Sequence, residues 1–222
     1  KILTANKIAK PLNSSTEQSK IYNLDLQKLT NLMLEKKRWK DLPNSNEYEV
    51  SRSILVSTTD VRKSNSAAMY LALSSFAINN GEVVTDKATA RNVAMQVAEL
   101  FKRQGYQENY VNGNFDDYVS IGIGKTPLAF IYENQMVSYA MSKKGIAADM
   151  VLMYPAPTIF NKVVFVAVNE KAKILGELLA NDPQLQKIGI EYGFRGSDPA
   201  AFAGEAKKAG LMVNERITEV ID

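Results

Sequence analysis

Short apolar runs alternate with longer stretches of helical spacing along most of the chain. The apolar runs end in polar or turn residues, as strands do, and they lie at 53–57, 127–132, 150–154 and 163–168. Apolar residues three and four apart predict helices at 24–34, 66–79, 87–104, 134–142, 171–180 and 184–191, and Ser197-Asp198-Pro199 opens a further helix. Strands separated by helices indicate an α/β fold with a mainly parallel sheet.

Three segments qualify this pattern. Residues 1–20 are polar and irregular, and residues 106–119 are polar and aromatic with a turn signal at Asn112-Gly113-Asn114. The run at 163–168 is apolar throughout, so we expect a strand that is buried on both faces.

A dense polar cluster follows the strand predicted at 53–57. Hydroxyl, amide, carboxylate and guanidinium groups crowd residues 57–66, and a helix begins directly after them. The first turn of a helix leaves N–H groups unpaired and favours negative charge, so this place suits an anionic or oxygen-rich ligand. The plainer alternative is that Ser64, Asn65 or Ser66 is only the N-cap that any helix needs.

A second polar group, Tyr132, Glu133 and Gln135, follows the strand predicted at 127–132. Ligands of parallel sheets bind beyond the carboxyl ends of the strands, so we expect both groups to line one pocket. The alternative for Glu133 is a structural ion pair, for which Arg62 is the candidate partner.

Composition removes several kinds of chemistry. The 222 residues include no histidine and no cysteine, which excludes Ser-His-Asp and Cys-His nucleophiles, thiolate or imidazole zinc sites, and disulfides. The Gly-Lys-Thr at 124–126 lacks the earlier glycine of a phosphate-binding loop, because Val119 stands there, and a strand rather than a helix follows. We therefore expect no enzyme, no cofactor and no metal site. A hydrolase that uses Ser or Lys with a carboxylate is a further alternative, although no Ser-x-x-Lys signature supports it.

The net charge of +3 is small, and the strongest basic cluster is at 36–40. Lysine and arginine near a helix C-terminus complement its dipole, so we read the cluster as a solvated helix end. No basic stripe studded with aromatic residues accompanies it, and we expect no nucleic-acid partner.

Five segments stand in a recognisable order: the helix and tryptophan turn at 24–42, the strand, polar loop and helix at 53–76, PLAFIYENQ at 127–135, VLMYPAP at 151–157, and the stretch from Asn181 to Gly193-Phe194-Arg195. In this order they resemble the periplasmic solute-binding proteins of the second topological class, which serve ATP-driven importers of molybdate, phosphate, sulfate and similar ligands. The resemblance implies periplasmic-binding-protein-like (type 2) lobes with mainly parallel sheets flanked by helices.

The resemblance also implies a domain order and a function. Residues 1–56 would be the end of lobe one and the crossing strand, 57–154 lobe two, and 155–222 the return to lobe one with the C-terminal helices. The protein would be periplasmic or envelope-bound. It would capture a small polar or anionic solute in an interlobe cleft, closing by a hinge, for an ABC-type importer whose membrane subunits are its partners.

The site residues come from the same resemblance. One wall would be formed by Thr58, Thr59, Asp60 and Arg62, donors to ligand oxygens would be Ser64, Asn65 and Ser66, and the opposite wall would contain Tyr132, Glu133, Gln135 and Tyr154. Arg62 is expected to pair with a ligand charge. The carboxylates of Asp60 and Glu133 make a zwitterionic or hydroxylated ligand an equal alternative to an anion.

One departure from the family affects the partners. Most of lobe one normally precedes the segments matched here, so we expect the helices at 24–34 and 171–195 to expose apolar faces and to cause self-association or binding of a partner segment. The alternative function is a structural or interaction protein that keeps the fold without binding a ligand.

Overall fold

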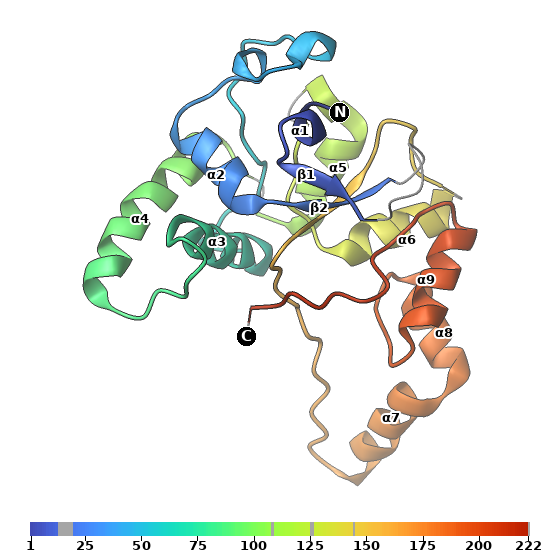
Figure 1. Ribbon diagram of the computed structural model, residues 1–222. Helices are drawn as coiled ribbons and strands as arrows, with labels where there is room; N and C mark the ends of the chain where they lie inside the picture. Colours follow the sequence, from blue (N-terminus) through green and yellow to red (C-terminus); the bar gives the residue numbers. More distant parts are fainter. Residues whose placement is uncertain (13–19, 108, 125–126, 144, 222) are drawn as a thin grey trace.

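The computed structural model describes residues 1–12, 20–107, 109–124, 127–143 and 145–221 (Figure 1). It is a mixed α/β structure in which helices outnumber strands. The helices are α1 (Ile2–Ala5), α2 (Leu26–Leu34), α3 (Asn65–Ile78), α4 (Lys87–Lys102), α5 (Val111–Ile121), α6 (Glu133–Lys143), α7 (Glu170–Asn181), α8 (Pro183–Glu191) and α9 (Pro199–Lys208). The strands are β1 (Ala9–Pro11), β2 (Ile21–Leu24) and β3 (Leu152–Pro155), and short 3₁₀ turns lie at Trp39–Asp41, Ser45–Glu47 and Gly122–Gly124.

The three strands form one small sheet in the order β1-β2-β3. β1 runs antiparallel to β2, with Ala9 opposite Leu24, whereas β3 runs parallel to β2, with Leu152 opposite Ile21. The expected parallel pairing is therefore present in one of the two ladders of this sheet.

Two apolar cores flank the sheet, because side chains alternate between its faces. The first core gathers β2 residue Leu24 with α2, α3 and the end of α4, and the second core gathers Ile21 with α5, α6, α8 and α9. In β3, Leu152 and Tyr154 belong to the second core while Met153 packs on the first.

Local signals explain where most helices begin. The Asp25 side chain accepts a hydrogen bond from the Lys28 N–H and caps α2, and Asp86 caps α4 in the same way. An Asp-Pro pair opens both α8 and α9, with proline in the first turn where no N–H is needed. The helices predicted from these signals are confirmed within a few residues.

Three expectations about the elements are wrong. The turn signal at 112–114 lies inside α5, because Asn114 is buried and Phe115 enters the second core. Residues 1–20 include α1 and β1 among their described positions. The segments at 53–57 and 127–132 are not continuous strands: an isolated parallel bridge joins Ser57 to Ala129, and an isolated antiparallel bridge joins Ser53 to Arg38.

Two expectations about burial are also wrong, and one is confirmed in part. The apolar face of α2 is covered, since Leu26, Leu29 and Met33 are buried in the first core. The run at 163–168 is neither a strand nor buried: its valines are exposed, and Phe165, the least exposed of its large side chains, packs on α7 at Gly176. The expected exposure at 171–195 is confirmed for the apolar side chains of α7, whereas in α8 Ile190 is buried in the second core.

Candidate functional site

The N-terminus of α3 lacks the cap that most helices carry. Ser64 occupies the N-cap position with φ −121° and ψ 130°, but its side chain makes no capping bond. None of the amide N–H groups of residues 65–67 donates to an acceptor in the described part of the protein. The Ser66 hydroxyl, in the same first turn, is buried and has no hydrogen-bond partner there. The plain N-cap role considered for Ser64 is therefore not what this side chain does.

The turn before α3 is organised by Asp60. Its carboxylate accepts bonds from the Arg62 backbone N–H and from guanidinium Nε and Nη2, at 2.9, 3.0 and 2.6 Å. The hydrogen bonds from Arg62 lower the pKa of Asp60 to about 2. The Asp60 carboxylate is almost fully covered, but the Arg62 side chain is 81% exposed, so its outer face is open to solvent beside the start of α3.

The threonines between the strand and this turn are held differently. Thr58 donates from its N–H to Gln104 Oε1, and its hydroxyl lies 2.9 Å from the same oxygen and also contacts Gln107. Thr59 is fully buried, and its hydroxyl has no partner in the described structure. Thr58 thus has a structural role, because it bonds to Gln104 and Gln107. The hydroxyls of Thr59 and Ser66, which lie close in sequence to the start of α3, have no hydrogen-bond partner in the described structure.

The two predicted polar groups do meet. The Asn65 side-chain amide donates to the Tyr132 hydroxyl at 2.9 Å, and its nitrogen is 3.5 Å from Asn161 Oδ1. The Gln135 side chain accepts from the Tyr132 N–H at 3.0 Å and so fixes the entry to α6. Because α3 packs in the first core and α6 in the second, this contact lies where the two cores adjoin.

Buried Asn114 also links the two segments that meet at this junction. The Ser57 hydroxyl is 2.6 Å from Asn114 Oδ1, and the Asn114 amide donates to the carbonyls of Ser57 and Phe130. The backbone of Ser57 also exchanges bonds with Leu128 and Phe130. The ends of both predicted strands are therefore fastened side by side, which carries Asn65 towards Tyr132.

Glu133 and Tyr154 belong to a separate network. Glu133 accepts from Arg195 Nε at 2.6 Å, from Arg195 Nη2 at 2.7 Å and from the Tyr154 hydroxyl at 2.5 Å. Arg195 also donates to the carbonyls of Asn214 and Glu215, and its guanidinium lies 4.8 Å above the ring of Phe202. The ion pair considered as the alternative role of Glu133 is present, but its partner is Arg195 and not Arg62, which pairs with Asp60.

Charge and burial act together in this network. Burial raises the pKa of Tyr154, and the charge of the Glu133 carboxylate and its hydrogen bond raise it further, so the phenol stays a donor. Burial acts to lower the pKa of Arg195, but the hydrogen bond and charge of Glu133 outweigh it and the pKa is raised. Glu133, Tyr154 and Arg195 are therefore hydrogen-bonded to one another. The hydroxyl groups without a partner in the described structure, those of Thr59 and Ser66, belong to the segment around Asn65.

Arg195 reaches Glu133 because of a glycine. Gly193 has φ +81°, and a Cβ there would lie 2.4 Å from the Asn134 carbonyl oxygen of α6. Only glycine permits this close approach and this left-handed turn. The Gly-Phe-Arg sequence is visible from the residues alone, but its partner is 62 positions away and no local signal names it. Gln104 and Asn114 are missed for the same reason.

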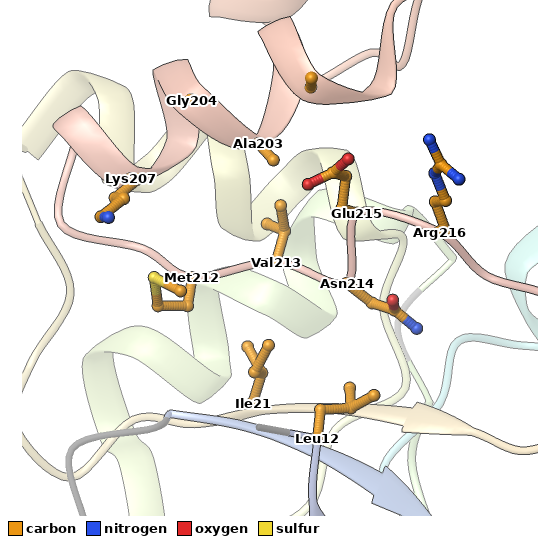
Figure 2. A pocket seen from close by; sticks show the side chains of 11 residues that line it. Leu12, Ile21, Ala203, Gly204, Lys207, Met212, Val213, Asn214, Glu215 and Arg216 are labelled. Carbon is orange, nitrogen blue, oxygen red and sulfur yellow. The ribbon is translucent and has the colours of Figure 1, made fainter. Parts of the chain in front are cut away.

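A cavity lies on the far side of the Glu133–Arg195 network, where Arg195 donates to the carbonyls of Asn214 and Glu215 in its lining. It measures about 590 Å³ and is lined by Leu12 and Ile21, by α9 at Ala203, Gly204 and Lys207, and by residues 212–216 (Figure 2). Figure 2 shows Ala203, Gly204 and Lys207 of α9 on one side, and Leu12 and the β2 residue Ile21 on the other. None of the predicted site residues lines it.

Comparisons with protein-family models, curated proteins and solved structures found no match. Among the described residues, no helix is both long and apolar enough to cross a membrane, and no group of three carboxylates is placed to hold a metal ion. The Lys125 and Thr126 of the dismissed phosphate-loop signal lie outside the described residues.

Proposed function

We propose that this protein is an extracytoplasmic solute-binding module that holds a small oxyanion or other oxygen-rich solute at the N-terminus of α3, for delivery to an ABC-type importer. The observation that carries the proposal is the uncapped helix start. Three amide N–H groups and the buried Ser66 hydroxyl lack acceptors in the described structure, beside the open face of Arg62. Unpaired first-turn N–H groups and a guanidinium are donors that favour oxyanions.

The position of this site supports capture by closure. Asn65 on α3 and Tyr132 ahead of α6 face each other across the junction of the two cores. A ligand bound there would contact elements of both cores, as in type 2 binding proteins, which close around a solute. The Asn65–Tyr132 bond would then mark the closed edge of the site, with Ser64 and Ser66 beneath the ligand.

The test uses proline at the first position of the helix. Asn65→Pro removes one of the three N–H groups, and Ser64 already has the extended conformation that a residue before proline needs. Lys87→Pro at the first position of α4 is the matched control, since Asp86 before it is equally extended. Asn65→Ala keeps the N–H and removes only the side-chain amide.

Thermal unfolding is measured with molybdate, phosphate, sulfate and a zwitterionic amino acid. A ligand at a hundred times its Kd adds about 2.7 kcal/mol to the stability of the native state. For a chain of this size, that raises the Tm by roughly 5–11 °C. We expect this rise for the unmodified protein and Lys87→Pro and its loss in Asn65→Pro. No rise with any of these solutes, or an equal rise in Asn65→Pro, rejects the proposal.

A second candidate is the structural or interaction protein. The apolar side chains exposed along 160–179 favour it, because monomeric proteins rarely leave patches of this extent uncovered. An intact fold that binds no solute but self-associates would decide for this candidate.

A further inference from the structure

A projecting arm, which we define as residues 157–181, carries much of the exposed apolar surface. Figure 1 shows the extended segment and α7 leaving the body of the protein together. No residue of α7 is buried. Ten large apolar side chains of the arm are exposed: Phe160, Val163, Val164, Phe165, Val166, Val168, Ile174, Leu175, Leu178 and Leu179.

The extended part of the arm has no backbone partner over most of its length. Thr158 bonds to the backbone of Glu219 and Ile221, but from 159 to 168 no backbone group bonds another within the described chain. Residues 163–168 are four valines, a phenylalanine and an alanine, a composition of high strand propensity. An uncharged edge of this kind is a template for pairing with another strand.

One side of this run is already fixed to α7. A Cβ on Gly176 would lie 3.2 Å from the Phe165 ring, so the ring packs directly on the helix backbone. Val164, Val166 and Val168 are each at least 72% exposed. The run and α7 thus form a unit that offers an open backbone edge and an uncovered row of valines.

We propose that this arm pairs with the arm of a second copy of the chain, through an antiparallel ladder of residues 164–168 in which Val166 of each copy faces Val166 of the other. The proposal does not depend on solute binding. A two-fold pairing of identical segments closes on itself and leaves both copies with the same contacts.

Charge determines the direction of pairing. Lys162 precedes the uncharged run and Glu170 follows it. Antiparallel pairing centred on Val166 brings Lys162 of each copy near Glu170 at the start of the other copy's α7, whereas parallel pairing would set like charges side by side. Glu170 is 85% exposed although it contacts Lys173, so it is accessible to a second lysine.

The available area fits a dimer. A standard interface buries about 800 Å² on each partner. Ten valine, leucine, isoleucine and phenylalanine side chains at the observed exposures offer an area on the order of 800 Å² per copy, more than the roughly 300–600 Å² patch of a typical monomer.

The first test measures oligomeric state by light scattering and sedimentation over a wide concentration range. The unmodified chain is expected to dimerise, and Val166→Lys to remain monomeric because two like charges meet at the centre. Met95→Lys, on the exposed face of α4, is the matched control and keeps the dimer. Circular dichroism checks that each variant is folded. A chain that stays monomeric throughout overturns the proposal.

The second test examines charge and register. Lys162→Glu or Glu170→Lys alone should weaken dimerisation by roughly 2- to 30-fold, since two cross-strand pairs are lost per dimer, and the double exchange should restore it. The chain has no cysteine, so single cysteines report the register directly. Val166→Cys should cross-link to its own copy, because opposed Cα atoms at about 4.5–5.5 Å are within disulfide reach. In Val163→Cys the two cysteines would lie about 20 Å apart along the ladder and should not cross-link. Equal cross-linking at both positions, or no rescue by the double exchange, overturns the antiparallel arrangement.

Discussion

Removal of the Arg195 side chain should be among the most damaging single changes in this protein. Arg195 ties the start of α6 to the segment at 214–215, and its side chain and that of Glu133 are about one-fifth exposed. Arg195→Ala leaves the Glu133 carboxylate without its cation and leaves two backbone carbonyls without their donor. The Tyr154 hydroxyl remains as a donor to Glu133 but cannot replace the charge.

The expected magnitude lies between two limits. Breaking a fully buried ion pair from one side costs about 3–5 kcal/mol. An exposed pair contributes only about 0–1 kcal/mol. The low exposure and the additional carbonyl contacts place this pair near the buried limit, at about 3 kcal/mol, and the stacking on Phe202 adds about 0.5–1 kcal/mol. A loss of about 3 kcal/mol lowers the Tm of a chain of this size by roughly 6–12 °C.

Urea and thermal unfolding, followed by far-UV circular dichroism, measure this effect. Arg216→Ala is the control, because Arg216 is exposed, makes no ion pair among the described residues, and should change stability by no more than about 0.5 kcal/mol. Glu133→Ala and the double variant complete a cycle. The double variant should cost less than the sum of the singles, since each single leaves one charge unpaired. A loss below about 1 kcal/mol for Arg195→Ala, or strict additivity, refutes the reasoning.

Three further outcomes can be measured on the same protein. The pKa of Asp60 is lowered from 3.8 to about 2, so its pair with Arg62 stabilises the fold above about pH 4, and this stabilisation is lost as the pH falls towards 2. In acid titrations, the stability difference between the unmodified protein and Asp60→Asn should shrink over that interval. Gly204→Ala should raise stability by about 0.5–1 kcal/mol, because the added methyl group meets no atom and the residue lies inside a helix. Gly193→Ala should lower stability by more than about 2 kcal/mol, because its φ is positive and the added methyl group would collide with α6. Urea unfolding should show stability changes of opposite sign for the two variants. Since the pKa of Tyr154 is raised, its contribution is complete below about pH 10 and is lost as the pH rises further; Tyr154→Phe should flatten the alkaline limb of the stability curve, and an unchanged limb contradicts the assignment.

The sequence predicts the helices well because their ends carry local chemistry. Asp182-Pro183 and Asp198-Pro199 each combine a capping carboxylate with a proline that suits the first turn, and both helices start there. The turn predicted at 112–114 is wrong because of tertiary contacts: the Asn114 side-chain amide donates to the backbone carbonyls of Ser57 and Phe130. Local propensity cannot anticipate such a partner.

Burial and pairing are harder to predict than element type. The run at 163–168 has the composition of a strand covered on both faces, but the pattern does not say what covers it. In the candidate site, the meeting of Asn65 and Tyr132 follows from placing both at strand ends. The pairing of Glu133 with Arg195 does not, because their separation of 62 residues has no periodic or spacing signal.

The predicted site residues at the start of α6 belong to two separate hydrogen-bond networks. Glu133 is satisfied inward by Arg195 and Tyr154, which anchors the first turn of α6 in the second core. Tyr132, one residue earlier, turns the other way and meets Asn65 on α3, which is anchored in the first core. The closure proposed above would use the outer contact, because breaking the neutral Asn65–Tyr132 bond exposes no charge, whereas breaking the Glu133–Arg195 pair would. Opening at this junction would therefore separate the two cores at the α3 start first, where the unpaired N–H groups lie.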